Sequence, residues 1–214
     1  MATVQDGIVF VVDDDRRIRE ALCLLLASFD IRAMSFASAA EFMAFAQPDV
    51  PACLVLDVQL PDINGLELQS RIAGSHPPHI VFLTGHGDVP STVQAMRNGA
   101  VDFLTKPVAE ADLMSAIRTA LAQNRSARER QAKLCELRER HSQLTPRERD
   151  VLPLVVSGLL NKQAAAELGI SEITLQIHRS HIMKKMAAES LPELVRMAGA
   201  LEIPMTHARR ARGR

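Results

Sequence analysis

The sequence LVLDVQLPDINGLEL, residues 54–68, joins a short apolar run to a helical pattern, and Asp57 stands directly after the apolar run. The run is short and does not alternate in polarity, which is typical of a parallel strand covered on both faces. Asp57 would then lie beyond the carboxyl end of a strand, where ligands bind in an open α/β sheet. An Asp at such a position is usually a turn or cap residue, so Asp57 alone assigns no function.

The same alternation of apolar runs and helical patterns extends over the first 121 residues. The apolar runs are residues 8–12, 31–35, 53–56, 80–84 and 102–105, and the helical patterns lie near residues 16–29, 38–46, 65–74, 89–98 and 109–122. Ser38 and Glu41 form a capping-box pattern at the start of the second helix. Five strands alternating with five helices predict an α/β domain with a five-stranded, parallel, doubly wound sheet.

Length and charge indicate a second domain with a different partner. The chain has 214 residues, which suits two domains, and 47% of them are hydrophobic. Residues 1–121 contain 8 Lys and Arg against 15 Asp and Glu, whereas residues 122–214 contain 17 against 10. The basic half suits a polyanionic partner, although two solvated surfaces can also differ by chance. The absence of Trp and Tyr argues against a single-strand binder that stacks bases on aromatic side chains.

The cysteines and the N-terminus favour a reduced, cytoplasmic protein. Cys23, Cys53 and Cys135 show no metal-ligand or disulfide spacing, and the first two lie in apolar runs that favour burial. The N-terminus shows no signal-peptide pattern, and no run of about 20 apolar residues could cross a membrane. We therefore expect no membrane partner.

Residues 123–143 are predicted to form a helical linker that continues from the fifth helix. They are rich in Arg, Glu, Gln and Ala, and they lack Gly and Pro. A stripe at spacings of three and four runs along this segment and consists of Leu134, Leu137, His141 and Leu144. Either the stripe packs against a partner helix, or the helix is solvated and the stripe is incidental. The predicted domains are residues 1–122, this linker, a helical domain at residues 144–205, and a basic, disordered tail at residues 206–214.

Capping signals divide residues 144–205 into four predicted helices. Thr145, Pro146 and Glu148 occupy the N-cap, N1 and N3 positions of the first helix. The predicted N-caps of the other three are Asn161, Ser171 and Ser190, the last opening another capping box. Pro153 falls inside the first helix, where it removes one backbone hydrogen bond and can produce a kink.

Polar residues follow the strands of the first domain, and the carboxyl ends of parallel strands meet at one edge of a sheet. The residues at those ends are Asp13, Asp14, Asp57, Thr84 and Lys106. A carboxylate that accepts a phosphoryl group needs a divalent cation to neutralise the incoming charge, and donors to hold the phosphoryl oxygens. Mg²⁺ keeps several waters, so one or two carboxylates suffice to bind it. These residue types therefore supply an acceptor, a magnesium site, a hydroxyl donor and a cation.

Four motifs carry a family resemblance. They are VVDDD (residues 11–15), LVLDVQLPDINGLEL (54–68), VFLTGHGD (81–88) and AVDFLTKP (100–107). As an ordered set they are highly specific, and they resemble the receiver domain of two-component response regulators across residues 6–122. The resemblance implies a CheY-like fold and a sensor histidine kinase as a partner.

The resemblance also implies a role for each acidic residue. Asp57 would accept phosphate from the kinase. Asp14 and Asp57 would ligate Mg²⁺ through their side chains, and Gln59 would contribute its backbone carbonyl. Asp13 would act on the metal mainly through water.

Thr84 and Phe103 match the switch pair of this family, and Lys106 supplies the cation. The resemblance implies that the hydroxyl moves toward the phosphoryl group while the aromatic ring turns inward, although Phe103 can also be an ordinary core residue. The loop GHG, residues 85–87, has the backbone freedom to move and would line the site entrance. Phosphorylation would then reshape the surface of residues 89–105, which the resemblance implies pairs with another receiver.

The stretch AAAELGISEITLQIHRSHIMKKM, residues 164–186, has the pattern of a helix-turn-helix. Gly169 suits the turn, and Ile170 and Leu175 would fill the core. A helix over residues 172–186 would be the recognition helix, which lies in the major groove of DNA.

The wider pattern over residues 143–201 resembles the LuxR/NarL-type effector domain, and with the receiver motifs it resembles the FixJ-type regulators. Position within the motif predicts phosphate contacts by Lys162, Thr174, Arg179, Lys184 and Lys185. It predicts base contacts by Gln176, Ile177 and Ser180, since Gln can pair with adenine and Ile can contact a thymine methyl group. Many relatives have Lys in place of Gln176, so the target sequence is expected to differ.

The leading hypothesis is a phosphorylation-dependent transcriptional regulator, in which phosphorylated Asp57 promotes a homodimer that binds double-stranded promoter DNA. The amphipathic last helix is implied to pair two effector domains on an inverted repeat. Two alternatives remain: a constitutive DNA-binding protein with a structural receiver, and an intermediate that passes phosphate to another protein. RNA polymerase is a further candidate partner. Apart from slow phosphotransfer and self-hydrolysis by the receiver, no enzyme activity is expected.

Overall fold

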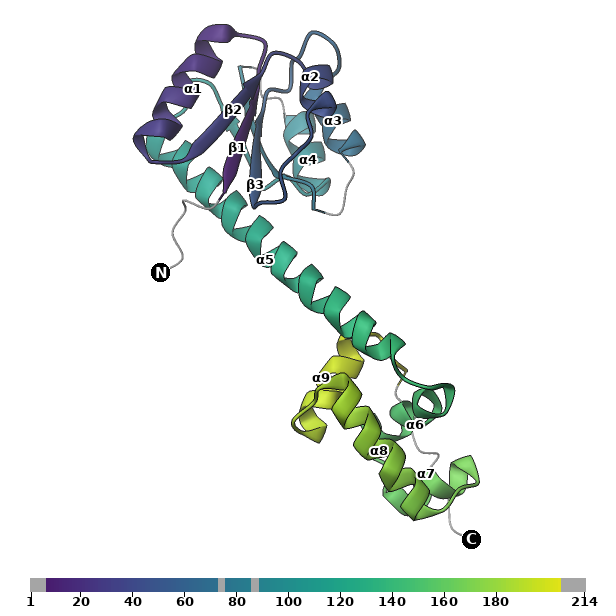
Figure 1. The fold of residues 1–214 in the computed structure, drawn as a ribbon. Coiled ribbons are helices and arrows are strands. Elements are labelled where there is room, and N and C mark those ends of the chain that lie inside the picture. The colour runs from purple at the N-terminus through teal and green to yellow at the C-terminus, as the bar shows by residue number, and fades with distance from the viewer. Residues whose placement is uncertain (1–6, 73–75, 86–88, 205–214) are drawn as a thin grey trace. The chain divides into compact units, whose positions relative to one another are not determined.

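The computed structural model describes residues 7–72, 76–85 and 89–204. The chain forms two compact units that divide between Glu129 and Arg130, within one helix. The elements of the N-terminal unit are β1 (Ile8–Val12), α1 (Arg16–Ser28), β2 (Arg32–Phe36), α2 (Ala39–Ala44), β3 (Ala52–Leu56), α3 (Gly65–Arg71), β4 (His79–Thr84), α4 (Val89–Arg97), β5 (Asp102–Thr105) and the start of α5 (Glu110–Ser142) (Figure 1). The C-terminal unit contains the end of α5 with α6 (Pro146–Val156), α7 (Asn161–Leu168), α8 (Glu172–Met186) and α9 (Leu191–Ala200). In these described ranges, every helix is too short or too polar to cross a membrane.

The strands of the described residues form one five-stranded parallel sheet in the order β2-β1-β3-β4-β5. This is the doubly wound arrangement that the alternation of strands and helices predicts. Val12 at the end of β1 pairs with Phe36 of β2 and with Leu56 of β3. The central strands therefore end level, and the residues that follow them, Asp13 and Asp57, start from the same edge of the sheet.

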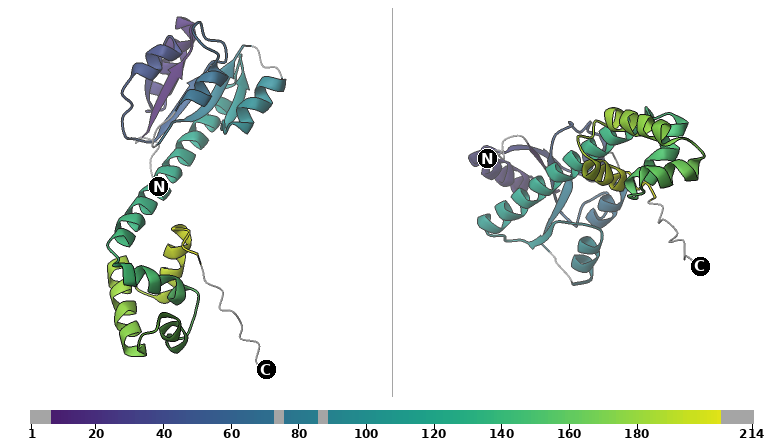
Figure 2. Two further views of the ribbon diagram at one scale, coloured as in Figure 1. Left: turned by 90° about the vertical axis from the view of Figure 1, so that its right-hand side faces the viewer. Right: turned by 90° about the horizontal axis from the view of Figure 1, so that it is seen from below.

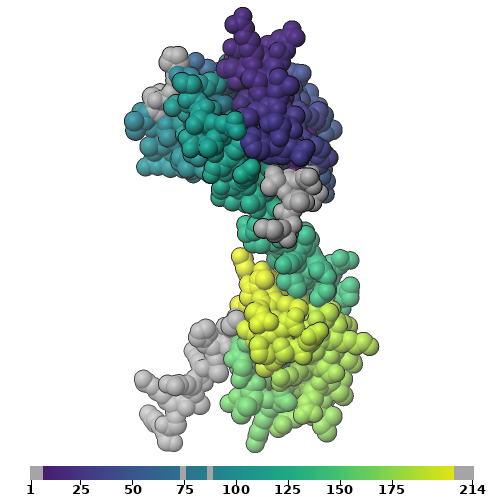
Figure 3. All heavy atoms as spheres, turned by 90° about the vertical axis from the view of Figure 1, so that its left-hand side faces the viewer, coloured from purple at the N-terminus to yellow at the C-terminus, as the bar shows by residue number. Residues whose placement is uncertain are grey.

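Two apolar layers cover the two faces of the sheet, because successive side chains of a strand point to opposite faces. Val9 and Val11 pack with α1 and the first turns of α5, whereas Phe10 and Val12 pack with α2, α3 and α4. A cluster of aromatic rings fills part of the second layer: Phe10, Phe36, Phe42 and Phe45. Figure 2 gives two further views of this layering, and Figure 3 looks at the unit from the side that α1 covers.

Most strands and helices of the N-terminal unit lie within two residues of their predicted bounds. The strand predicted at residues 31–35 begins one residue later, because the backbone N–H of Ile31 donates to Leu26 in the turn after α1. Cys53 is buried as predicted, but Cys23 is only half-buried, since Leu22 and Leu26 occupy the core-facing positions of α1. The predicted end of the third helix, loop residues 86–87 and the basic tail lie outside the described residues.

The predicted linker is the second half of α5, which runs without interruption from Glu110 to Ser142. Asn124, which is 1% exposed, holds this helix against the sheet. Its Oδ1 accepts a hydrogen bond from the backbone N–H of Ala52 at 3.0 Å, and its Nδ2 donates to the carbonyl of Pro77 at 2.8 Å. A buried amide is stable only with such partners. Asn124 therefore connects α5 to the segments that begin β3 and β4.

The C-terminal unit packs α6, α7, α8 and α9 around one apolar core (Figures 1 and 2). Leu175 of α8 is fully buried in it, and Ile170 packs against it, as predicted. Leu137 near the end of α5 and Leu144 just after it also join this core. The linker stripe is predicted either to pack or to be solvated. Leu137 and Leu144 of this stripe pack, and they do so against the core of the C-terminal unit.

The start of α6 is the predicted one. Thr145 and Glu148 form a complete capping box, and the helix continues through Pro153 to Val156. Ser171 is the N-cap of α8 and Ser190 is the N-cap of α9, as predicted.

Two capping predictions are wrong. The N-cap of α7 is Leu160, because the side chain of Asn161 accepts a hydrogen bond from Arg179 Nη1 at 3.2 Å instead of capping its own helix. The box predicted at Ser190 is incomplete, since the carboxylate of Glu193 accepts from the backbone N–H of Glu189 rather than from that of Ser190.

Gly65, the first residue of α3, packs closely against the backbone of Asp57. A Cβ atom there would lie 2.3 Å from the carbonyl oxygen of Asp57. We expect Gly65→Ala to lower the free energy of unfolding by about 2 kcal/mol, because the backbone must move to relieve the overlap. Urea unfolding followed by circular dichroism measures this difference.

Gly199→Ala in α9 is the matched control. A Cβ at Gly199 would meet nothing within 4 Å. Ala is favoured over Gly inside a helix by about 0.5–1 kcal/mol, so this variant should be slightly stabilised. Equal stability of Gly65→Ala and the unsubstituted chain would contradict the close approach of α3 to Asp57.

Candidate functional site

An acidic cluster forms where β1 and β3 end. Asp13 follows β1 and Asp57 follows β3, and one carboxylate oxygen each from Asp13, Asp14 and Asp57 lie within 4.8 Å of one another. Asp13 is 2% exposed and Asp57 is 7% exposed, whereas Asp14 is open to solvent. The structure therefore brings together the three carboxylates that the sequence predicts, two of them buried.

Lys106 supplies the positive charge of this cluster. Its Nζ lies 2.6 Å from Asp13 Oδ2 and 2.6 Å from Asp57 Oδ2. The backbone N–H of Lys106 donates to the carbonyl of Thr84 at 2.8 Å, which extends the pairing of β4 and β5 and brings the lysine to the same edge. Burial alone would lower the pKa of Lys106, but hydrogen bonds and attraction from both carboxylates outweigh it and raise this pKa. The ammonium therefore stays charged at neutral pH.

Backbone groups hold the second oxygen of each buried carboxylate. Asp13 Oδ1 accepts from the backbone N–H of Asp15 at 2.9 Å, and Asp57 Oδ1 accepts from that of Gln59 at 3.0 Å. The backbone N–H of Asp57 donates to Val12 at 2.9 Å, which ties β3 to β1 at this point. Both carboxylates are thus oriented before any ligand arrives, which lowers the cost of binding.

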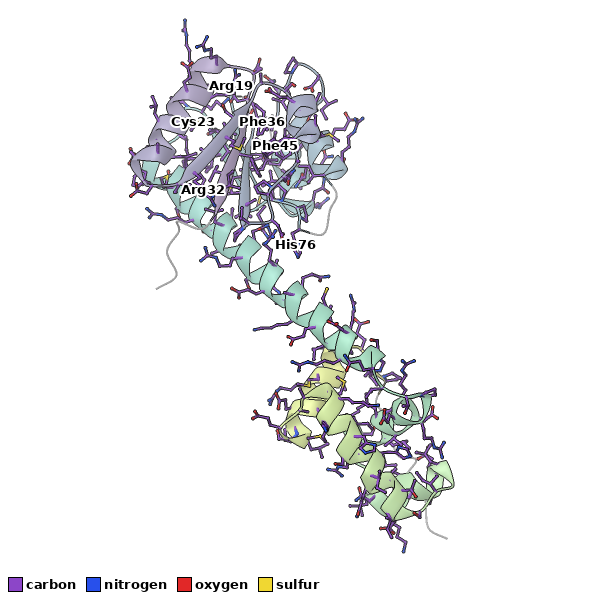
Figure 4. The ribbon with its side chains drawn as sticks, in the orientation of Figure 1. Arg19, Cys23, Arg32, Phe36, Phe45 and His76 are labelled. Carbon is purple, nitrogen blue, oxygen red and sulfur yellow. The ribbon has the colours of Figure 1, made fainter. Side chains whose placement is uncertain are left out.

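Arg19 of α1 is a contributor that the sequence did not reveal. Its Nη1 donates to the backbone carbonyls of Asp13 at 2.8 Å and Asp14 at 2.9 Å. These two hydrogen bonds stabilise the loop after β1, which carries Asp13 and Asp14. Figure 4 labels Arg19 on α1. Arg19 lies four residues after Asp15, the N-cap of α1, so its position one turn into the helix is the signal that sequence reasoning could have used.

The other predicted residues of this site lie around the cluster. Thr84 is fully buried, and Phe103 is half-buried with its ring centroid 5.7 Å from that of Phe82. Gln59 is exposed, and its backbone N–H donates a hydrogen bond to Asp57 Oδ1. Part of the predicted entrance loop, His86 and Gly87, lies outside the described residues.

The cluster fits a divalent cation on charge and donor chemistry. Asp13, Asp14 and Asp57 offer carboxylate oxygens, which are the ligands that Mg²⁺ prefers. Three carboxylates against the one ammonium of Lys106 leave a surplus of two negative charges, equal and opposite to the charge of Mg²⁺. The residues present therefore fit the predicted metal.

Comparison with known families matches residues 9–118 to the family described as "Response regulator receiver domain", and residues 142–198 to "Bacterial regulatory proteins, luxR family". Nodulation protein W of Bradyrhizobium diazoefficiens is 47% identical over 203 residues, which cover 94% of this chain and 89% of the relative. Transcriptional regulatory protein FixJ of Azorhizobium caulinodans is 44% identical over 192 residues, 89% of this chain and 90% of the relative. The chain belongs to the FixJ-type response regulators.

Among solved structures, that of the response regulator StyR matches with a TM-score of 0.79 and 42% identity, covering 91% of this chain and 98% of that one. The N-terminal unit of this response regulator is its receiver domain, and the C-terminal unit contains its LuxR-type effector domain. This combination implies regulation of transcription in a two-component system, with a histidine kinase and DNA as partners.

The effector domain presents one face of α8 to solvent. Gln176, Ile177, Ser180 and Lys184 are all exposed, and their spacings of three and four place them on the same side of the helix. Ile173 belongs to this face as well and is 72% exposed. Sequence reasoning missed it, although its spacing of four from Ile177 was visible.

Three of the predicted phosphate contacts have partners inside the effector domain. Lys185 Nζ donates to Glu148 Oε2 at 2.7 Å, and Arg179 donates to Asn161. Thr174 Oγ1 lies 2.8 Å from Ser171 Oγ, at the cap of α8. The fourth and fifth candidates, Lys162 and Lys184, are exposed.

Glu148 is a buried charge that the sequence indicated only as a capping residue. It is 2% exposed, and its carboxylate accepts from Lys185 and from the backbone N–H of Thr145. Burial alone would raise the pKa of Glu148, but these hydrogen bonds and the charge of Lys185 outweigh it and lower this pKa. Glu148 therefore joins the start of α6 to the last turn of α8.

We expect Glu148→Gln to lower the stability of the effector domain by about 1–3 kcal/mol at pH 7, because Lys185 loses its charged partner. Since the pKa of Glu148 is lowered on folding, its stabilising effect is complete above the unfolded-state pKa of about 4.3. The effect is lost as the pH falls through the folded-state pKa. Thermal unfolding at neutral and acidic pH should show the two proteins converging in acid.

Glu167→Gln, at an exposed position of α7, is the control and should be neutral at both pH values. A stability difference for Glu148→Gln that does not change with pH would contradict the ionised, Lys185-bound state of Glu148.

Proposed function

We propose that this response regulator accepts a phosphoryl group on Asp57 and that this modification raises its affinity for promoter DNA by promoting a homodimer. The observation that carries the proposal is the position of Asp57, buried at the edge of the sheet with Lys106 at 2.6 Å and two further carboxylates beside it. The LuxR-type effector domain on the same chain supports DNA binding as the output.

The residues of the receiver suit phosphoryl transfer. The Asp57 carboxylate would attack phosphorus, and the bond from phosphorus to the nitrogen of a phosphohistidine would break. Bound Mg²⁺, held by Asp14 and Asp57 side chains with Asp13 close by and the Gln59 carbonyl as a further ligand, would neutralise charge on the phosphoryl oxygens. Lys106 is positioned to hold one of these oxygens as it now holds Asp57.

The proposed switch links the site to the surface of α4 and β5. The hydroxyl of Thr84 would turn toward the new phosphoryl group, and Phe103 would turn further into the space behind it. Phe103 is only half-buried, so its ring has apolar surface left to bury. Phosphorylation adds about 1.5–2 negative charges, which is sufficient to shift a balance between two such arrangements.

The same region offers an apolar surface for dimerisation. Val89 of α4 is 76% exposed, Val93 is 42% exposed and Met96 is 45% exposed. These spacings of four and three place the three side chains on one face of the helix. A contiguous exposed apolar face commonly marks a protein–protein contact. In this proposal, it pairs with the same face of a second receiver.

Light scattering on a sizing column tests the coupling. With Mg²⁺, beryllofluoride as a phosphoryl mimic should convert the wild-type chain from monomer to dimer and leave Asp57→Asn a monomer. Asp62→Asn, five residues away at an exposed position, should behave as wild type. A mass that does not change for wild type, together with equal DNA binding by wild type and Asp57→Asn, would favour the constitutive DNA-binding alternative.

The exposed face of α8 is proposed to read DNA in the major groove. Gln176, Ile177 and Ser180 would meet base edges, and Lys184 and Lys162 would contact phosphates. Lys185, Arg179 and Thr174 would add phosphate contacts while keeping their partners in the domain. RNA polymerase is proposed as a further partner of the DNA-bound dimer.

Duplexes selected by the wild-type chain from a random library test these roles. Lys184→Gln should weaken binding to all duplexes alike and reduce the salt slope by about one, because one phosphate contact is lost. Gln176→Ala should instead cost about 1–3 kcal/mol at one base pair and relax the selected sequence there. Failure of the wild-type chain to retain any duplex would favour the phosphate-transfer alternative.

A further inference from the structure

Arginine side chains close the C-terminal ends of helices in the effector unit. Arg140 Nη1 donates to the backbone carbonyl of Met186 at 3.0 Å, at the end of α8. Arg147 donates to the last carbonyl of α7, and Arg149 donates to that of α5. The last carbonyls of a helix lack partners within the helix and carry partial negative charge, so a guanidinium stabilises them. Of these three contacts, that of Arg140 reaches the recognition helix.

The capping turn of α8 leaves the carbonyl of Met186 to Arg140. Ala187 ends the helix in the left-handed conformation, with φ 53°, which is strained for a residue other than Gly. The backbone N–H groups of Ala187 and Ala188 donate back to carbonyls within the last turn, but not to that of Met186. Arg140 supplies the partner that the Met186 carbonyl accepts.

Arg140 belongs to α5, the helix that begins in the receiver. Near it, Leu137 packs against the effector core, and the side chain of Glu136 accepts from Arg140 Nη2 at 2.6 Å. The first turns of the same helix are buried in the receiver core, where Ile117 is fully buried. One continuous helix therefore contributes to the core of the receiver and holds the end of the recognition helix.

We propose that Arg140 is a positioning residue for DNA recognition, which ties the last turn of α8 to the linker half of α5. This inference rests on the proposed role of α8 in reading DNA. The last turn of α8 carries Lys184 and Lys185, two of the proposed phosphate contacts. Holding the Met186 carbonyl therefore also fixes the backbone from which these two side chains extend. Movement of the end of α5 within the effector unit must either carry this turn along or break the bond from Arg140.

A direct contact of Arg140 with DNA phosphate is the competing role. Both terminal nitrogens of the guanidinium already have partners, Met186 and Glu136, and the side chain is only 30% exposed. These contacts favour positioning. The two roles differ in salt dependence, because only a residue that neutralises a phosphate changes the salt slope of binding.

The test uses the full chain with three substitutions. Arg140→Met keeps the aliphatic part of the side chain and removes the hydrogen-bond donors. Arg140→Lys keeps the positive charge and an ammonium donor that can reach the Met186 carbonyl. Arg138→Met, two residues away at an exposed position of the same helix, is the matched control. Each chain is measured for affinity to a duplex selected by wild type, for the salt slope of that affinity, and for amide hydrogen exchange over residues 182–188.

Arg140→Met should bind the selected duplex about fivefold more weakly, the ratio expected for one lost, partly exposed hydrogen bond from a charged donor. The salt slope should not change, amide exchange at the end of α8 should rise, and exchange in α6 should stay as in wild type. Arg140→Lys should recover most of the affinity, and Arg138→Met should match wild type.

Three outcomes would overturn the proposal: unchanged affinity of Arg140→Met, unchanged exchange at the end of α8, or a salt slope reduced by about one, which would show a phosphate contact. Thermal unfolding of each variant shows whether the substitution has disrupted the whole fold. If Arg140→Met is disrupted in this way, the affinity and amide exchange of Arg140→Lys are the test of the proposal. If the wild-type chain selects no duplex, the proposed function fails by itself. Exchange at the end of α8 still tests whether Arg140 holds that turn.

Discussion

The bridge from Lys106 to Asp13 and Asp57 is the interaction on which the receiver depends. Two carboxylates that are less than a tenth exposed would repel each other and would be costly to bury without a shared cation. The bridge also joins three strands, since its members follow β1, β3 and β5. The same contact therefore stabilises the edge of the sheet and holds the Asp57 carboxylate in position beside a surplus of negative charge that suits Mg²⁺.

The effector domain uses the same kind of contact to hold α8. Glu148 is a buried carboxylate whose desolvation cost is offset by Lys185, and this pair joins the start of α6 to the last turn of α8. Arg140 adds a second charged contact in the same last turn of α8, at the carbonyl of Met186. In both domains, a buried charged contact between segments distant in sequence holds the segment that carries the candidate site residues.

The sequence indicated much of this architecture because its signals are local. Short apolar runs predicted the strands, and caps such as Thr145 and Ser171 predicted helix starts. Asn161 shows the limit, because its side chain serves Arg179 of another helix rather than its own backbone. Propensity ranks Asn as a good cap but cannot show that a partner 18 residues away competes for it.

The sequence by itself determined the order of the elements, the candidate acceptor Asp57 and the candidate recognition helix, because periodicity, caps and strand-end carboxylates depend on residues close together in the chain. Only the tertiary structure decided which charges meet. Lys106 lies 93 residues from Asp13, and Arg140 lies 46 residues from Met186. Contacts at such separations arise from sheet register and helix packing, which no local pattern encodes.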